Sequence, residues 1–231
     1  MASNTLILFD IDGTLLRGAG SHHKDALIEA IRRVTGISCS FEGIDTSGQL
    51  DRDLIRTLLA SSRLSQRRIQ RDLTRIMHEA QLCYQQSCSI DLRSKVLPGV
   101  VEALGELQRR GIPLALVTGN LTAIAWRKLE LAGLRDYFAF GAFAEQGRTR
   151  ARLAQVAAWQ AKRRGLVKPG CSVSLIGDHA NDIAAAKANG FKAIAVATGL
   201  MPAEELRLHG PDLLLKDLTQ LPFDSLFAWP E

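Results

Sequence analysis

The chain has 231 residues, which is long for one ordinary domain and short for two, and this length suits a core domain with an inserted lobe. Hydrophobic residues make up 46% and charged residues 23%, a composition that supports a sizeable core and excludes a disordered chain. The net charge of +5 mildly favours anionic ligands but does not predict nucleic-acid binding, and the 6% of aromatic residues leave few platforms for stacking bases.

Cysteine spacing and hydropathy indicate a cytoplasmic protein. The four cysteines form no CxxC pair and match neither a disulfide framework nor a zinc site, so we expect reduced thiols at Cys39, Cys83, Cys88 and Cys171. No apolar stretch approaches the ~18 residues of a membrane span. The first residues lack the basic segment of a signal peptide, and we expect no association with a membrane. The sequence does not indicate an oligomeric state.

Taken in chain order, short apolar runs alternate with helical patterns. Buried strands are expected at 5–10, 113–117, 172–176, 192–196 and 212–215. Helices are expected between most of them, at 99–110, 121–133, 149–164, 180–189 and 202–208. Continuous apolar strands that alternate with helices predict an α/β fold, with a doubly wound, Rossmann-like parallel sheet covered by helices on both faces.

The segment between the first two strands has a different pattern. It contains no convincing strand, and Leu and Ile recur at the three- and four-residue spacing of helices in residues 23–35, 49–61 and 65–89. An insertion of roughly seventy residues is too long for a connecting loop and suits a small helical lid. We therefore predict an α/β core formed by 1–16 and 97–231, and an inserted all-helical cap formed by 17–96.

Acidic residues follow two of the expected strands. Asp10 and Asp12 come at the end of the first strand, and Asp178 and Asp182 follow the strand at 172–176. Residues i and i+2 of a strand point the same way, so Asp10 and Asp12 can address one point at the sheet edge where α/β folds bind ligands. Several carboxylates there repel each other unless a cation lies among them. Hard oxygen ligands without a His or Cys cluster predict Mg²⁺.

A second cluster carries the polar groups of an anion site. Thr118, Gly119 and Asn120 follow the strand at 113–117, where a hydroxyl and backbone N–H groups at a helix N-terminus could bind an anion. An arginine at the start of the next helix would complete the site. A turn or a helix cap would account for any one of these clusters alone. A carboxylate, a metal, a hydroxyl, backbone donors and an arginine around one anion together describe phosphoryl transfer.

These segments resemble the four motifs of the haloacid dehalogenase-like superfamily of hydrolases: DIDGT at 10–14, TGN at 118–120, a basic residue, and GDHAND at 177–182. The helical insertion after the first motif resembles the phosphoglycolate phosphatase-like branch. The resemblance implies that Asp10 attacks phosphorus and forms an aspartyl phosphate. It also implies that Asp12, with a raised pKa, acts first as general acid and then as general base.

The resemblance further implies which residues bind the metal and the phosphoryl group. Mg²⁺ would be held by the Asp10 side chain, the Asp12 backbone carbonyl and Asp178, with Asp182 in or near that shell. The phosphoryl group would be held by the segment Thr118, Gly119 and Asn120.

The third motif is a single basic residue, for which the sequence offers Arg148, Arg150 and Lys168. We favour Arg150, because RARL at 150–153 resembles the Arg-x-x-Leu helix start of relatives that lack the usual lysine. Lys168 is expected to be exposed in the turn before the strand. His179, beside Asp178, is expected either to adjust that carboxylate or to be an inert neighbour.

Two features of the predicted cap have more than one interpretation. Arg63, Arg67, Arg71 and Arg75 recur every four residues and form a basic stripe, which either steers an anionic substrate or is a solvated helix face. The polar segment Thr46–Asp51 either faces the site and reads the substrate through Gln49 or Asp51, or is an interhelical turn.

The leading interpretation is a Mg²⁺-dependent phosphatase that hydrolyses a small phosphorylated metabolite. The combination of Asp12 and Asp178 argues against a dehalogenase, because such members of the superfamily lack the second aspartate and the metal. A sugar phosphomutase, which shares all four motifs, is one alternative. A non-catalytic phosphate-binding module is the other.

Overall fold

The computed structural model describes residues 2–18, 21–60, 62 and 64–223. Its centre is a six-stranded sheet in the order β3-β2-β1-β4-β5-β6, in which all neighbouring strands are parallel. The strands are β1 (Ser3–Phe9), β2 (Leu114–Val117), β3 (Gly141–Ala142), β4 (Val167–Gly177), β5 (Lys192–Val196) and β6 (Leu213–Leu215).

The α-helices are α1 (His22–Thr35), α2 (Asp51–Ala60), α3 (Gln66–Ser87), α4 (Val100–Arg109), α5 (Thr122–Ala132), α6 (Arg150–Arg163), α7 (Ala180–Ala188) and α8 (Ala203–Leu208). Short 3₁₀ helices are η1 (Arg93–Lys95), η2 (Arg135–Tyr137), η3 (Ala144–Gln146) and η4 (Leu218–Gln220).

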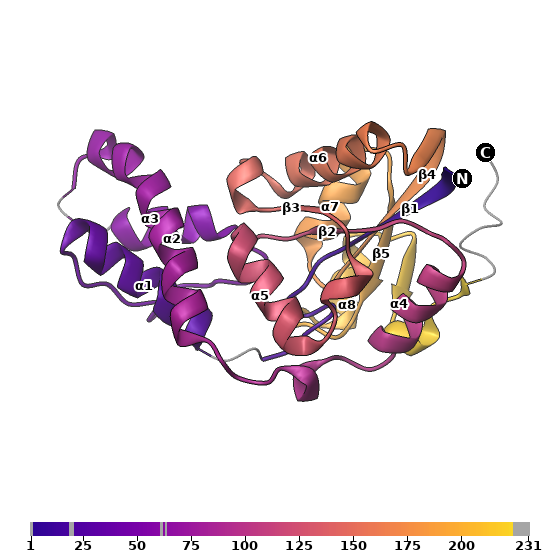
Figure 1. The fold of residues 1–231 in the computed structure, drawn as a ribbon, viewed down its shortest axis with the longest axis horizontal. Helices are drawn as coiled ribbons and strands as arrows, with labels where there is room; N and C mark the ends of the chain where they lie inside the picture. Colours follow the sequence, from indigo (N-terminus) through magenta and orange to yellow (C-terminus); the bar gives the residue numbers. More distant parts are fainter. Residues whose placement is uncertain (1, 19–20, 61, 63, 224–231) are drawn as a thin grey trace.

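The predicted α/β fold with a doubly wound parallel sheet is confirmed (Figure 1). Residues of β1 alternate between the two faces of the sheet. Leu6 and Leu8 belong to the apolar cluster that includes α6 and α7, whereas Ile7 and Phe9 belong to the cluster that includes α4 and much of α5. All four side chains are fully buried, which is why the strand is continuously apolar in the sequence.

Two strands differ from the expectation. The two-residue strand β3 was not predicted, because Gly141 and Ala142 are too few to show a periodicity of their own. Strand β4 begins at Val167 rather than at 172, since its first part pairs with Ser3 ahead of a register shift.

The strand order places three polar loops side by side. β1 lies between β2 and β4, so the chain leaves it toward one side for β2 and β3 and toward the other side for β4 to β6. The carboxyl ends of β1, β2 and β4 therefore meet at the point where an open α/β sheet forms its ligand-binding crevice. Those ends are Phe9, Val117 and Gly177, and the predicted motifs continue from them.

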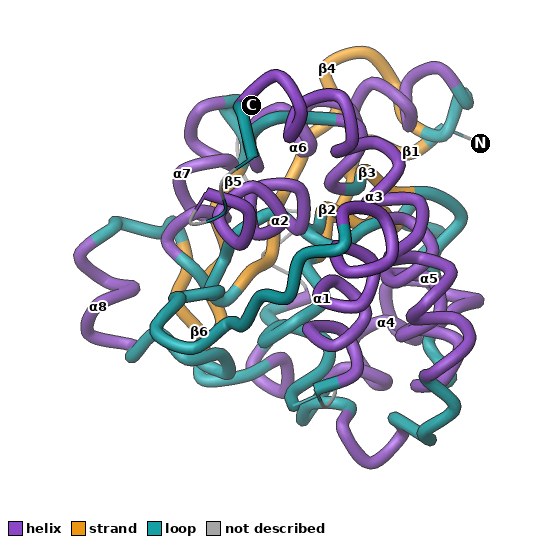
Figure 2. Tube along the Cα trace, turned by 90° about the vertical axis from the view of Figure 1, so that its left-hand side faces the viewer, coloured by secondary structure: helices purple, strands orange, loops and turns teal. Residues whose placement is uncertain are grey.

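Helices α1, α2 and α3 are hereafter called the cap helices. They lie together at one end of the molecule (Figure 1), and Figure 2 views the molecule from that end, with these helices in front of the strands. Leu27 and Ile31 of α1 are buried in one cluster with Leu73 and Ile76 of α3. The three helices predicted in the insertion are thus present, with α2 beginning at Asp51. The division into a core (1–16 and 97–231) and a cap (17–96) stays a prediction.

Two simpler features accompany this architecture. Among the described residues, no helix has the length and apolar character needed to cross a membrane. The four cysteines are all free thiols, with Cys83 and Cys88 buried and Cys39 and Cys171 partly buried.

The loop between α1 and α2 contacts the sheet edge directly. The Asp51 N–H donates to the Gly119 carbonyl oxygen at 2.8 Å, and Asn181 Nδ2 donates to the Gly48 carbonyl oxygen at 2.9 Å. A Cβ atom at Gly119 would overlap the carbonyl oxygen of Gln49. The loop can approach this closely only because position 119 has no side chain.

We expect two glycine substitutions to have opposite effects. Gly119→Ala should lower the unfolding free energy by ~1–3 kcal/mol, because the added methyl displaces the loop backbone. Gly105→Ala should raise it by ~0.5–1 kcal/mol, since Gly105 lies inside α4 with open space around it. Chemical denaturation measures both changes. Hydrogen exchange of residues 46–51 should accelerate only in Gly119→Ala, and an equal response of the two variants would contradict the close contact.

Candidate active site

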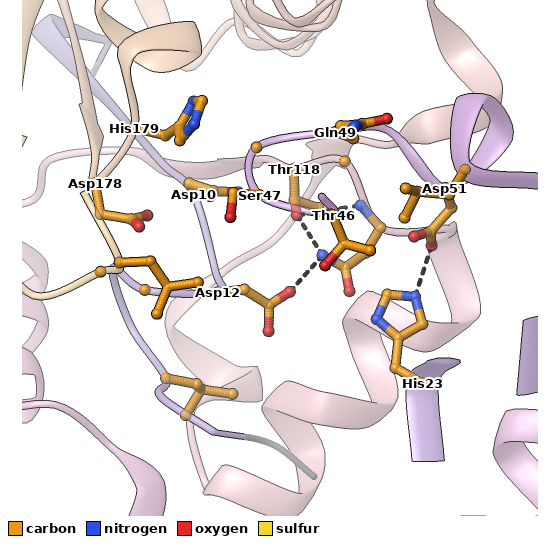
Figure 3. Close-up of a pocket in the computed structure, with 18 of the residues that line it drawn as sticks. Asp10, Asp12, His23, Thr46, Ser47, Gln49, Asp51, Thr118, Asp178 and His179 are labelled. Atoms are coloured by element: carbon orange, nitrogen blue, oxygen red, sulfur yellow. Dashed lines mark hydrogen bonds and ion pairs between the residues drawn. The ribbon is translucent and has the colours of Figure 1, made fainter. Parts of the chain in front are cut away.

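A pocket of about 420 Å³ lies at the carboxyl ends of β1, β2 and β4. Figure 3 shows Asp178 and His179 on one side of it, His23 and Asp51 on the other, and Asp10, Asp12 and Thr118 between them. The segment Thr46–Gln49 and the cap helices α1 and α2 contribute further lining, as do Lys128 of α5 and Arg150 of α6. The predicted motifs and the polar loop therefore border one cavity.

Three carboxylates converge at this pocket, and two of them, Asp10 and Asp178, line it. Asp10, Asp178 and Asp182 each place a carboxylate oxygen within 4.8 Å of the others, and all three side chains are buried. Arg150 lies beside them, with Nη1 2.9 Å from Asp10 Oδ1 and Nε 3.3 Å from Asp182 Oδ1. When all three are ionised, three carboxylates against one guanidinium leave an excess of two negative charges in the cluster.

Burial and the crowding of the carboxyl groups raise the pKa values of Asp178 and Asp182. Burial raises the pKa of Asp178 first, and the charges of Asp10 and Asp182 raise it further. Burial also raises the pKa of Asp182, against the opposing charge of Arg150. Asp182 Oδ1 is buried and accepts no hydrogen bond from the described residues. An oxygen-only cluster with uncompensated charge fits a hard divalent cation, which would relieve the repulsion.

Of the three candidate basic residues, Arg150 enters the site. Thr149 caps α6 by accepting from the Arg152 N–H at 3.2 Å, so Arg150 occupies the first helical position. Its side chain is buried and also donates to the Val117 carbonyl oxygen at 3.2 Å. Arg148 is exposed, and neither it nor Lys168 lines the pocket. Lys168 lies exposed within β4 rather than in the predicted turn.

The expected anion site differs in its details from the structure. Thr118 is fully buried and faces the pocket, as expected. The Asn120 N–H, however, donates to Thr118 Oγ1 at 3.3 Å, and Asn120 Nδ2 donates to Thr118 Oγ1 at 2.8 Å and to Asp12 Oδ2 at 2.7 Å. Helix α5 begins only at Thr122, two residues beyond Asn120. The backbone amide of Asn120 is therefore engaged locally rather than at a helix N-terminus.

The N-terminus of α5 is capped by side chains from elsewhere. Asp51 Oδ2 accepts from the Leu121 N–H at 2.8 Å, Glu145 accepts from the Thr122 N–H at 3.0 Å, and Gln81 accepts from the Ala123 N–H at 2.8 Å. These partners satisfy donors that the helix cannot pair internally. The expectation that Asp51 reads a substrate is not supported by this position, because its carboxylate is occupied and 3% exposed.

Sequence reasoning missed Lys128. This lysine lies on α5 with a side chain that is 2% exposed, and its Nζ is 2.8 and 2.7 Å from the two carboxylate oxygens of Asp12. It also donates to Asn120 Oδ1 at 2.7 Å. The available signal was a lysine on the apolar stripe of a helix, in register with Ala125, Leu129 and Ala132.

The contact with Lys128 overturns the expected pKa of Asp12. Desolvation acts to raise that pKa, but the charge of Lys128 and the hydrogen bonds from Lys128 and Asn120 act against it, and the pKa lies below its ordinary value. In the sequence, the only charge evident beside Asp12 is that of its neighbour Asp10. The sequence therefore predicted a raised pKa for Asp12, which is wrong for this structure.

His179 has a structural position. Its Nδ1 accepts from the Asn181 N–H at 3.1 Å and so caps α7, and a side chain at Gly48 would overlap its ring. Burial lowers the pKa of His179, and the charge of Arg150 lowers it further. The ring thus supports the loop that covers the pocket.

The basic stripe of the cap lies away from the pocket. Arg67, Arg71 and Arg75 are exposed on α3 and do not line the cavity, and Arg71 pairs with Asp72 at 2.8 Å. Arg63 lies outside the described residues. This placement favours a solvated helix face.

Comparison with known proteins relates this chain to a family and to several named sequences. A family model described as haloacid dehalogenase-like hydrolase matches residues 5–190. A probable phosphatase, IndB, from Dickeya dadantii (strain 3937) is 26% identical over 223 residues, which cover 94% of this chain and 91% of that protein. A phosphoglycolate phosphatase from Chromobacterium violaceum is 33% identical over 133 residues, covering 54% of each chain. That of Escherichia coli (strain K12) is 29% identical, covering 54% of this chain and 49% of its own length.

Solved structures share the fold over nearly the whole chain. A predicted phosphatase from Clostridium acetobutylicum has a TM-score of 0.67 at 19% identity, covering 98% of this chain and 99% of the other. A β-phosphoglucomutase from Clostridium difficile has a TM-score of 0.65 at 20% identity, covering 98% and 96%. The family match includes every carboxylate of the acidic cluster. We conclude that this chain belongs to the haloacid dehalogenase-like hydrolase family.

Proposed function

We propose that the protein is a Mg²⁺-dependent phosphatase that hydrolyses a small phosphomonoester through an aspartyl phosphate on Asp10. The observation that carries the proposal is the buried carboxylate of Asp10, which lies beside Arg150 and within 4.8 Å of the other two aspartates of the cluster. The phosphatase names of the relatives support the same reaction class. We place the reaction in the cytoplasm, with a phosphorylated metabolite as substrate.

In the first step, an oxygen of Asp10 attacks phosphorus and the bond from phosphorus to the leaving oxygen breaks. Asp12 gives its proton to that oxygen, so the alcohol leaves neutral. A carboxylate is already ionised at neutral pH, and Asp10 needs no activating base. Arg150, 2.9 Å from Asp10, balances the charge of the nucleophile and of the phosphoryl oxygens, and Thr118 donates its hydroxyl to that group.

In the second step, water attacks the phosphorus of the aspartyl phosphate. Asp12 now takes the proton of this water, the bond between Asp10 and phosphorus breaks, and inorganic phosphate leaves. The lowered pKa of Asp12 favours its ionised form, which is the form that can accept a proton from water in this step. In the first step, the phosphate dianion of the substrate would oppose the charge of Lys128 and favour the protonated carboxyl.

The cation would be held by Asp10, Asp178 and the Asp12 backbone carbonyl, with Asp182 in or near the same shell. When bound, Mg²⁺ supplies positive charge that stabilises the transferring phosphoryl group. We also propose that residues 17–96 act as a cap on the core formed by 1–16 and 97–231. A cap over a pocket of about 420 Å³ would exclude bulk water and leave room for a small leaving group.

The two alternatives are separated by product analysis. A sugar phosphomutase would return phosphate to a sugar hydroxyl, and the β-phosphoglucomutase likeness concerns the fold alone. A phosphate-binding module would show no turnover, although both Asp10 and Asp12 are present. Release of inorganic phosphate from a panel of phosphorylated metabolites supports the phosphatase and identifies its substrate.

Asp10→Asn should reduce turnover of p-nitrophenyl phosphate by roughly 10³-fold or more, because the amide is a poor nucleophile. The matched control is Asp136→Asn, at an exposed aspartate of η2, which should keep wild-type rates. Circular dichroism should show both variants folded. Substantial turnover by purified Asp10→Asn would remove Asp10 from the nucleophile role.

Chelation should silence the enzyme, and added Mg²⁺ should restore it. Mg²⁺ should also raise the melting temperature, because a ligand that binds only the folded state stabilises it by about 2.7 kcal/mol at a hundredfold excess over Kd. At a pH above about 8, where Asp178 is ionised, Asp178→Asn should be more stable than the wild type without metal, since one repelling charge is gone, and the variant should lose the response to Mg²⁺. An unchanged response of Asp178→Asn to Mg²⁺ would show that the cation binds elsewhere.

Arg150→Ala should lower kcat/KM by ~10²–10³, the usual loss for one donor to a transition-state oxyanion. Lys168→Ala should leave kcat/KM near the wild-type value, because Lys168 is exposed and remote from the pocket. Steady-state kinetics of the two variants side by side decide between them. A severe loss confined to Lys168→Ala would reverse the assignment.

A further inference from the structure

Lys128 is a buried lysine to which the proposed reaction assigns no role. A buried ammonium is costly unless all of its donors are paired. Its three donors face three side chains: Asp12 at 2.7 and 2.8 Å, Asn120 Oδ1 at 2.7 Å, and His23 Nδ1 at 3.2 Å. No donor is left to bind a substrate, so any effect of Lys128 on the reaction passes through these neighbours.

Packing alone does not hold the Asp12 side chain. It is 43% exposed, in contrast to the buried side chain of Asp10. Lys128 contacts both of its oxygens, and Asn120 Nδ2 donates to Oδ2 at 2.7 Å. Because Asn120 Oδ1 accepts from Lys128, its amide is oriented with Nδ2 toward Asp12. Lys128 thus orients Asp12 both directly and through Asn120.

The third partner of Lys128 comes from the cap helices. His23 lies in the first turn of α1, and its Nε2 is 2.9 Å from Oδ2 of Asp51, the first residue of α2. A carboxylate accepts, so we assign the proton of neutral His23 to Nε2, which leaves Nδ1 to accept from Lys128. Lys128 therefore has a full set of acceptors only when α1 lies against α5.

We propose that Lys128 is a positioning residue that holds the Asp12 carboxyl in line with the leaving oxygen, and that His23 and Asp51 stabilise this arrangement from the cap. The inference rests on the proposed function, in which the bond from phosphorus to the leaving oxygen breaks as the Asp12 proton moves to that oxygen. It adds Lys128, His23 and Asp51 as the side chains that position the Asp12 carboxyl for proton donation.

A series of leaving groups tests this role. p-Nitrophenolate leaves without a proton, whereas an alkoxide needs one, so a defect in proton delivery grows with the pKa of the leaving alcohol. General acid catalysis contributes ~10²–10⁴-fold. We expect Lys128→Met to lower kcat/KM by ~10²-fold for alkyl phosphates and by less than ~10-fold for p-nitrophenyl phosphate. Asp12→Asn should show the same dependence, and Lys128→Arg should recover part of the alkyl phosphate rate.

The double variant Asp12→Asn with Lys128→Met should be no more than about threefold slower than Asp12→Asn alone, because residues that act as a unit are not additive. The matched control is Lys162→Met, at an exposed lysine of α6, which should keep all rates. His23→Phe should produce a smaller loss with the same dependence on the leaving group. If Lys128→Met does not fold, Lys128→Arg and His23→Phe carry the test.

A loss that is equal for all leaving groups would overturn the positioning role. So would a full additional loss in the Asp12→Asn background. A His23→Phe variant that lacks any dependence on the leaving group would overturn the contribution of the cap. The proposed function fails by a different result, namely a wild-type protein without turnover or an active Asp10→Asn variant.

Discussion

The candidate active site is built around three carboxylates that are confined together at the carboxyl ends of β1 and β4. Buried like charges destabilise one another, and here the only guanidinium paired with them in the described residues is that of Arg150. Thr14 adds a hydroxyl that donates to Asp178 at 3.1 Å. Such a cluster would weaken an ordinary core. A cluster of buried like charges at the ligand-binding edge of the sheet is typical of a functional site, where the repulsion is tolerated because a bound group offsets it.

Asp10 and Asp12 are separated by one residue and meet opposite surroundings. Asp10 is buried among carboxylates beside Arg150, whereas Asp12 is half exposed and contacts Lys128 and Asn120. Two carboxyl groups in different environments are suited to different roles, here a nucleophile and a group that moves protons. The position of the strand end makes this possible, because both side chains leave the sheet at the same edge.

The contact between the cap helices and the sheet edge is polar and specific. Asp51 pairs with the backbone at Gly119 and at Leu121, and Gln81 of α3 caps the same helix α5. Helix α5 also carries Lys128. Residues of the cap helices therefore accept hydrogen bonds from backbone N–H groups at the N-terminus of α5, the helix that orients Asp12. These contacts connect the position of the cap helices to the reacting groups.

The sequence by itself determined the elements and the identity of the acidic cluster. Apolar runs, helical spacing and the two-residue period of a strand are local properties, so every strand except β3, the α-helices, and the convergence of Asp10, Asp178 and Asp182 could be predicted. Arg150 could be favoured because it begins a helix that follows a recognisable pattern.

Only the tertiary structure decided which groups surround each carboxylate. Lys128 is 116 residues from Asp12 and 105 residues from His23, and Asp51 is 70 residues from Leu121. Such pairings leave no periodic trace in the sequence, because they depend on how the cap helices lie against the sheet edge. The pKa of Asp12 follows from these distant contacts, which is why a prediction based on its neighbour Asp10 had the wrong sign.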